Sequence, residues 1–281
     1  MSNFRKRAQR KRVLIHRETS NLDGTNSRFF NSTYLGSRIL KISANPALQL
    51  PTDVAGLWAW WDVGVLSTLW QGTSRTTPVT GDGDPVQGWD DRSAAKFAFN
   101  TLGSCTYDAD GFNGLPAINF PKNAESFLAY SLTTIGTPCT FIAAMKSNEG
   151  TDYGYALVRT GTIRVYLEAD VYAGLGPGFY DGTHKALGLG TAKTNAEVFS
   201  MVFGSDLKAR LYENETEIST PGGVTYSDAT FGTPSGLYIG FGHTQSGFKG
   251  VFRELAVFSG DVSDTDRNYV VAGMRARGGL S

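Results

Sequence analysis

Cysteine and histidine are scarce in this sequence, as are charged residues and long apolar runs. Among 281 residues there are two cysteines and three histidines, and only 19% are charged. Two cysteines cannot build a disulfide framework or a four-thiolate metal site, so we expect two reduced, buried thiols. No stretch approaches the roughly 18 apolar residues of a membrane-spanning helix. The apolar run after the basic N-terminus is too short for a secretory signal, so we expect no membrane association.

The residues that are abundant suit a globular β protein. Apolar residues make up 41% of the chain, enough to bury a core, and 34 glycines suit short strands joined by tight turns. From residue 117 onward, short β-prone runs alternate with Gly, Pro, Asp and Asn. This pattern predicts an all-β fold, a two-sheet antiparallel sandwich. The expected strands are 117–120, 139–145, 163–167, 198–203, 207–212, 237–241 and 251–258.

One short helix is expected near the C-terminus. Ser263 can cap it, with Asp266 at the third helical position. Gly278 and Gly279 would end it. We expect it to lie against the sandwich through an apolar face made of Val270, Val271 and Met274.

The zero net charge hides a polarised chain. Residues 1–41 hold ten basic and two acidic residues, a charge of +8, whereas the remainder holds 16 basic and 24 acidic residues, a charge of −8. We interpret residues 1–41 as an arm that orders on docking to an acidic partner surface. Nucleic-acid contact and a solvated tail are less favoured alternatives, because the arm also carries aromatic and aliphatic residues. The expected docking residues are Arg5, Lys6, Arg7, Arg10, Lys11, Arg12, Phe29, Phe30 and Tyr34.

Prolines at positions 46 and 51 place a linker at residues 42–52. Beyond it, residues 56–62 read GLWAWWD, residues 89–93 read WDDRS, and residues 248–258 read FKGVFRELAVF. These motifs resemble the concanavalin A-like (LamG-type) jelly-roll domains common in bacteriophage structural proteins, over residues 53–281.

The resemblance implies a two-sheet jelly roll in a virion component such as a head decoration, collar, spike or tail fibre. It implies contacts with other virion proteins and several copies per particle or a homo-oligomer. Because such domains often bind glycans, an adsorption module for a host glycan is the alternative function. Aromatic residues in Gly-rich connections would suit glycan or partner contact: Tyr153, Tyr155, Tyr172, Phe179, Tyr180 and His184.

Tryptophan has the same two interpretations, ligand contact or core. Strand alternation places Trp58 and Trp60 on one face and Trp61 on the other. We expect Trp58, Trp60 and Trp89 to pack in the core, because they occupy framework positions of the resemblance.

Catalytic patterns are weak. Glu213, Glu215 and Glu217 alternate as on one strand face, which would suit a glycosidase carboxylate pair, but Asn214 favours a turn. The sequence has no G-x-S-x-G motif. We therefore predict that the chain is not an enzyme and needs no cofactor. Calcium is the one ion left open, since LamG-like domains often hold it with loop carboxylates, here Asp82, Asp84, Asp90 and Asp91.

Overall fold

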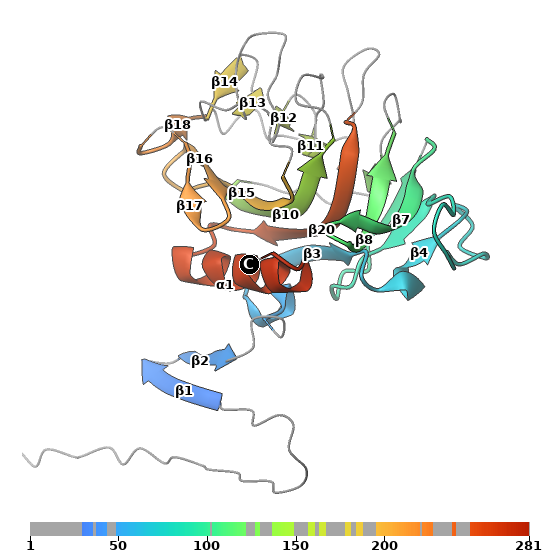
Figure 1. Ribbon diagram of the computed structural model, residues 1–281. Helices are drawn as coiled ribbons and strands as arrows, with labels where there is room; N and C mark the ends of the chain where they lie inside the picture. The colour runs from blue at the N-terminus through green and yellow to red at the C-terminus, as the bar shows by residue number, and fades with distance from the viewer. Residues whose placement is uncertain are drawn as a thin grey trace, which may run out of the picture. The chain divides into compact units, whose positions relative to one another are not determined.

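The structure is a computed structural model (Figure 1). Residue contacts divide the chain into two units, Met1–Ala44 and Asn45–Ser281. The described residues are 30–35, 38–43, 49–101, 103–121, 127–129, 137–148, 157–160, 163–166, 178–180, 184–187, 195–219, 221–226, 238–239 and 248–280.

The first unit contains one β-hairpin. β1 (Phe30–Leu35) pairs antiparallel with β2 (Arg38–Ser43), with Leu35 opposite Arg38 and Phe30 opposite Ser43. Two of the expected docking residues, Phe30 and Tyr34, therefore lie on a paired strand. A two-stranded hairpin alone is only marginally stable in water.

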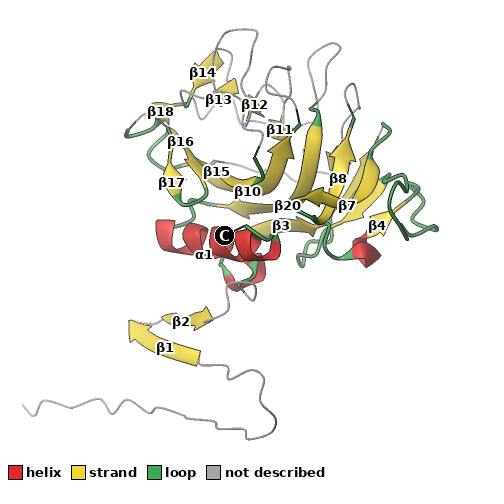
Figure 2. Ribbon diagram, viewed as in Figure 1, coloured by secondary structure: helices red, strands yellow, loops and turns green. Residues whose placement is uncertain are grey.

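The second unit is built from three antiparallel sheets (Figure 2). The nine-stranded sheet runs in the order β17 (Thr216–Glu217), β16 (Lys208–Glu213), β15 (Glu197–Phe203), β10 (Cys139–Ser147), β20 (Gly250–Ser259), β8 (Leu115–Phe120) and β7 (Thr106–Phe112); β18 (Val224–Thr225) pairs with β16, and β3 (Leu57–Asp62) pairs with β20. The five-stranded sheet contains β19 (Tyr238–Ile239), β9 (Phe127–Ala129), β6 (Ala98–Thr101), β5 (Gly88–Asp90) and β4 (Leu69–Trp70). The four-stranded sheet contains β11 (Leu157–Thr160), β12 (Ile163–Tyr166), β13 (Gly178–Tyr180) and β14 (His184–Ala186).

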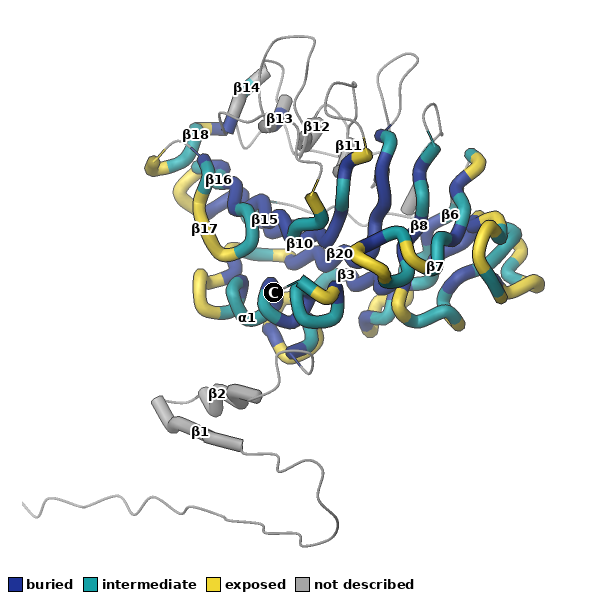
Figure 3. The backbone as a smooth tube through the Cα atoms, in the orientation of Figure 1, coloured by how far each residue is buried: buried dark blue, intermediate teal, exposed yellow. Residues whose placement is uncertain are grey.

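All the strands expected from the sequence are present, which confirms the all-β sandwich. The physical reason is visible on β10, whose alternate side chains enter two different cores. Phe141 and Met145 join a large inner cluster with Trp89 and Phe99 of the five-stranded sheet. Ile142 lies in a second cluster on the opposite face. Burial on both faces explains why the central strands are almost wholly dark blue in Figure 3.

The second cluster is closed by α1 (Asp264–Arg277), the expected C-terminal helix (Figure 1). Ser263 accepts a hydrogen bond from the backbone N–H of Asp266 at 3.2 Å, and Gly278 forms the C-cap. Three apolar side chains of α1 are fully buried against the sheet, Val270, Val271 and Met274. No helix in the described part of the chain is long and apolar enough to cross a membrane. Two short 3₁₀ helices, Pro51–Asp53 and Leu66–Thr68, precede β3 and β4.

The tryptophans are core residues, but their faces differ from the prediction. Trp60 and Trp89 are at most 2% exposed, and Trp58 stacks on Phe97 with ring centroids 4.3 Å apart. Val257 pairs with Ala59 while Phe258 pairs with Leu57, so Trp58 is the extra residue of a β-bulge. Trp58 therefore packs on the inner cluster and Trp60 beneath α1. The prediction that these two share a face was wrong because alternation fails across a bulge.

Candidate functional site

An open groove, here called the polar groove, lies between the turn joining β15 to β16 and the start of α1. It has a volume of about 620 Å³. Its walls combine three carboxylates, two guanidinium groups, two serine hydroxyls and a phenol: Val202, Ser205, Asp206, Arg210, Tyr212, Asp261, Val262, Ser263, Asp264 and Arg267. This lining offers both hydrogen-bond donors and acceptors around a partly apolar floor.

The first wall comes from the turn after β15. The backbone N–H of Gly204 donates to Lys208 at 2.9 Å, closing the turn and raising Asp206 into the groove. Arg210 on β16 donates to Asp206 from two nitrogens. This hydrogen bond lowers the pKa of Asp206. Asp206 is therefore suited to accept hydrogen bonds as an ionised group and poorly suited to donate a proton.

The second wall is the segment that leads into α1. Oδ2 of Asp261 accepts from the backbone N–H of Ser205 at 3.3 Å and from its hydroxyl at 3.4 Å. A methyl group placed on Gly204 would lie 2.6 Å from Oδ1 of Asp206 and 3.4 Å from Oδ2 of Asp261. The Asp206 carboxylate thus lies close to the backbone of Gly204, in space that a side chain at residue 204 would need.

The floor is an arginine stacked on an aromatic ring. The guanidinium carbon of Arg267 lies 3.5 Å from the ring centroid of Tyr212, and Arg267 is only 2% exposed. Asp264 and Asn268 hold the two terminal nitrogens of this arginine. Burial raises the pKa of Tyr212, so its hydroxyl remains protonated at neutral pH. The floor is consequently rigid and polar at its edge.

Most of the site residues expected from the sequence lie outside the described residues: Arg5, Lys6, Arg7, Arg10, Lys11, Arg12, Phe29, Tyr153, Tyr155 and Tyr172. For Phe30, Tyr34, Tyr180 and His184 only the strand backbone is described. Tyr180 on β13 pairs with His184 on β14. The described lining of the polar groove contains none of the predicted site residues.

Phe179 is the one expected contact residue that the structure corrects. Its side chain is fully buried, and its ring packs edge-on against Phe203 with centroids 5.6 Å apart. Lys185 covers it, with Nζ 5.5 Å from the ring centroid. Phe179 therefore joins the inner core and is not available to a surface ligand.

The aspartates considered for calcium are engaged by protein donors. Asp84 accepts from the backbone N–H groups of Thr80 and Gly81, and these bonds lower its pKa. Asp90 accepts from Trp70 and Arg75, while Asp82 accepts from the backbone of Ala109. Asp91, only 3% exposed, accepts from the backbone N–H of Trp60. Among the described residues, no group of three His, Cys, Asp or Glu side chains is placed to hold a metal.

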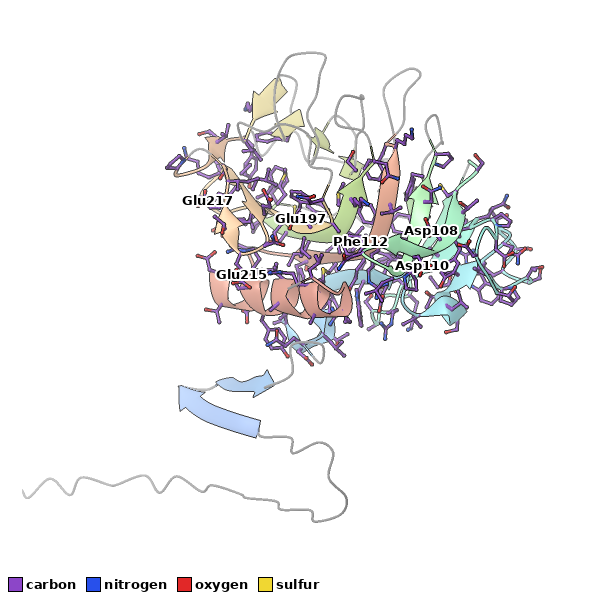
Figure 4. All side chains as sticks on the ribbon, viewed as in Figure 1. Asp108, Asp110, Phe112, Glu197, Glu215 and Glu217 are labelled. Atoms are coloured by element: carbon purple, nitrogen blue, oxygen red, sulfur yellow. The ribbon has the colours of Figure 1, made fainter. Side chains whose placement is uncertain are left out.

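The glutamate run is a hairpin turn, as Asn214 suggested. Asn214 adopts a φ of 54°, and Glu213 pairs with Thr216 across the turn. Glu217 pairs with Tyr212, so Glu213 and Glu217 lie on opposite faces. Glu215 lies beside α1, 3.8 Å from Arg275 (Figure 4). The run therefore does not form a carboxylate face.

The groove residues were missed by sequence reasoning. Asp206, Arg210, Asp261 and Arg267 are separated by up to 61 positions and match no motif. The only signal near them was the helix cap at Ser263, which predicted a helix start but no ligand site.

Comparisons with known proteins identify the fold and no family. No protein-family model and no curated protein sequence matches this chain. Domain 4 of AbnA, a GH43 extracellular arabinanase from Geobacillus stearothermophilus solved with arabinotriose, is 15% identical with a TM-score of 0.47, covering 78% of this chain and 99% of that domain. Trypanosoma rangeli sialidase with 2,3-difluorosialic acid is 12% identical with a TM-score of 0.50, covering 78% of this chain and 33% of the sialidase. An arabinofuranosidase complexed with arabinofuranosyl-α-1,2-xylobiose is 14% identical with a TM-score of 0.47, covering 68% and 51%.

These likenesses confirm a β-sandwich domain. The chain spans a third of the sialidase and about half of the arabinofuranosidase. The prediction that this chain is not an enzyme is also corrected, because a solved structure with a similar fold is a sialidase and the fold gives no ground for excluding an enzyme. That prediction took the absence of a motif as the absence of activity.

Proposed function

We propose that this chain is a carbohydrate-binding β-sandwich protein and that the polar groove is its glycan subsite. The observation that carries the proposal is the lining of the groove by carboxylate, guanidinium and hydroxyl groups around one open space. Sugar hydroxyls both donate and accept hydrogen bonds, so they match a wall that offers Asp206 and Asp261 as acceptors and Arg210 as a donor. Hydrogen bonds to charged groups are the stronger ones.

Preorganisation supports the same conclusion. Asp206 is held by Arg210, and Asp261 by Ser205, before any ligand is present. Arg267 is immobilised between Tyr212 and Asp264. A ligand would therefore order few side chains on binding, which lowers the entropic cost of association.

The test is an oligosaccharide panel measured by isothermal titration calorimetry. We expect Asp261→Ala to raise the dissociation constant of the best ligand about tenfold, since one charge-assisted hydrogen bond is lost. Asp110→Ala is the matched control, because Asp110 is an exposed aspartate on β7 at the other end of the nine-stranded sheet (Figure 4). Equal weakening by both variants, or no binding to any sugar in the panel, contradicts the proposal.

A second proposal is a virion component whose arm anchors it to a particle, with several copies or a homo-oligomer displaying the sandwich. Two observations favour it. The arm carries +8 against −8 for the rest of the chain, and residue contacts separate Met1–Ala44 from Asn45–Ser281. The motifs of residues 56–62, 89–93 and 248–258, which resemble the concanavalin A-like domains of phage structural proteins, agree with this assignment.

Co-sedimentation with particles lacking this protein tests the anchor. We expect the full chain to sediment with them and a chain without residues 1–41 to remain in the supernatant. If both sediment, the sandwich carries the attachment. If neither sediments, the virion assignment fails while glycan binding still stands or falls on the calorimetry.

A further inference from the structure

A second hollow, here called the basic hollow, lies beside β4, β5 and β6 of the five-stranded sheet. It has a volume of about 640 Å³. Residues from the turn after β4, from β5 and from the segment before β6 form it: Thr68, Arg75, Asp90, Asp91, Arg92, Lys96 and Ala98. It shares no residue with the polar groove.

Two of its three cationic residues hold an unusual backbone conformation. Arg75 has a φ of 55° and Lys96 a φ of 56°. This left-handed region is unfavourable for a residue with a β-carbon and is the ordinary place of glycine. Strain of this kind concentrates at ligand-binding sites, where it aims a side chain. Here both strained residues carry a positive charge toward one hollow.

The three cations differ in how many of their hydrogen-bond donors already have partners in the protein. All three side-chain nitrogens of Arg75 have hydrogen-bond partners. Its Nε donates to Asp90 at 2.6 Å, and its terminal nitrogens donate to the carbonyls of Thr73 and Phe99. This pair forms a neutral, fixed wall. Asp90 is held from its other side by Trp70 at 2.6 Å.

Only one of the side-chain nitrogens of Arg92 donates a hydrogen bond within the described part of the chain. One terminal nitrogen donates to Asp62 at 2.6 Å, and the guanidinium carbon lies 3.9 Å from the ring centroid of Trp60. Within the described part of the chain, its other nitrogens have no hydrogen-bond partner. The Trp60 ring beneath the guanidinium and the ion pair with Asp62 restrict the orientation of its remaining N–H groups.

Lys96 is exposed and has no hydrogen-bond or ion-pair partner among the described residues. Beneath it, the Asp91 carboxylate is saturated by donors that include the backbone N–H groups of Trp60, Ser93 and Phe97. The residues that line the hollow hold three positive and two negative charges, and the exposed lysine lies beside a guanidinium with spare donors. That combination matches a group with a single negative charge and two acceptor oxygens.

We propose that the basic hollow binds the carboxylate of an acidic sugar, with Lys96 and Arg92 as the contacting residues and Arg75 as a positioning residue. The inference rests on the proposed carbohydrate binding and adds the ligand class. A carboxylate is favoured over a phosphate or sulfate dianion because the residues that line the hollow hold only one positive charge more than negative charges. The carboxylate of a uronic acid also presents two coplanar oxygens, as a guanidinium requires.

The test compares galacturonic acid trisaccharide with its neutral counterpart, galactose trisaccharide, by calorimetry. We expect the wild-type protein to bind the acidic sugar at least about tenfold more tightly, with the difference shrinking as salt rises. Lys96→Gly is expected to remove this preference. It is also expected to leave the melting temperature unchanged or about 2 °C higher, since glycine relieves the left-handed strain. Loss of binding without loss of stability separates a ligand contact from a structural role.

Two further variants complete the experiment. Lys96→Arg keeps the charge and is expected to retain the acidic preference. Lys146→Gln on β10, which removes a partly exposed lysine outside the hollow, is the control for a nonspecific charge effect. Equal binding of the two sugars, or an unchanged acidic preference in Lys96→Gly, overturns the inference. If both sugars bind equally and Asp261→Ala weakens both, the inference fails and carbohydrate binding stands; if no sugar of either panel binds, both fail.

Discussion

Replacing Arg277 by methionine is expected to lower the free energy of unfolding by about 3–5 kcal/mol, because it leaves a buried carboxylate without its counter-charge. Glu254 on β20 has no exposed surface. Arg277 at the end of α1 contacts it through two nitrogens, at 2.7 and 3.2 Å. Trp60 on β3 donates to the same carboxylate at 2.8 Å. This network joins the helix to the two strands it covers.

The loss of stability caused by Arg277→Met is expected to depend on pH. Burial raises the pKa of Glu254, and Arg277 opposes that shift. A carboxyl whose pKa is raised in the folded state contributes stability that is fully present below the unfolded pKa and is lost as pH rises through the folded pKa. Without Arg277 the pKa of Glu254 rises further. The deficit of Arg277→Met is therefore expected to be larger in urea unfolding at about pH 8 than at about pH 5.

Arg275→Met is the matched control, since Arg275 lies two residues away on the same helix. Its ion pair with Glu215 is longer, at 3.8 Å, and both side chains are partly exposed. We expect a cost of at most about 1 kcal/mol. Equal costs for the two variants, or a cost of Arg277→Met that is independent of pH, would show that the buried pair does not act as described.

Gly273→Ala is expected to lower the free energy of unfolding by about 1–3 kcal/mol through overpacking. On helix propensity alone the change would stabilise α1 by about 1 kcal/mol, so the sign is diagnostic. An added β-carbon would overlap the carbonyl oxygen of Gln49 and lie 3.0 Å from Nη1 of Arg277. The Gln49 carbonyl also accepts from that nitrogen at 2.6 Å. The helix would have to move away from the segment that precedes β3.

Ala272→Gly, the reverse exchange at the neighbouring and less buried position, is the control. It is expected to cost about 1 kcal/mol through propensity alone. Thermal and urea unfolding of the two variants measure both changes in the free energy of unfolding. A Gly273→Ala protein more stable than wild type would mean that α1 does not pack this closely on Gln49.

The polar groove and the basic hollow could not be predicted from sequence patterns. Aromatic residues in the Gly-rich connections were predicted to contact a ligand, yet one of them, Phe179, is buried. The polar groove arises where a turn near residue 205 meets a helix start near residue 263. Neither segment has a ligand-binding motif, and their proximity depends on the packing of α1 on β15. The sequence also did not predict Arg75 and Lys96 as site residues, because a positive φ at a basic residue cannot be inferred from composition or spacing.

The sequence by itself determined the seven strands expected from residue 117 onward, the capped helix and the all-β class. These depend on local alternation, turn residues and capping, which act over a few neighbouring residues. Only the tertiary structure decided which face Trp58 takes, that Glu254 is buried against Arg277, and which polar residues surround each hollow. Such features depend on a bulge, on strand pairing between distant segments and on the docking of α1. They are set by contacts between residues far apart in the chain, which single-sequence periodicity does not record.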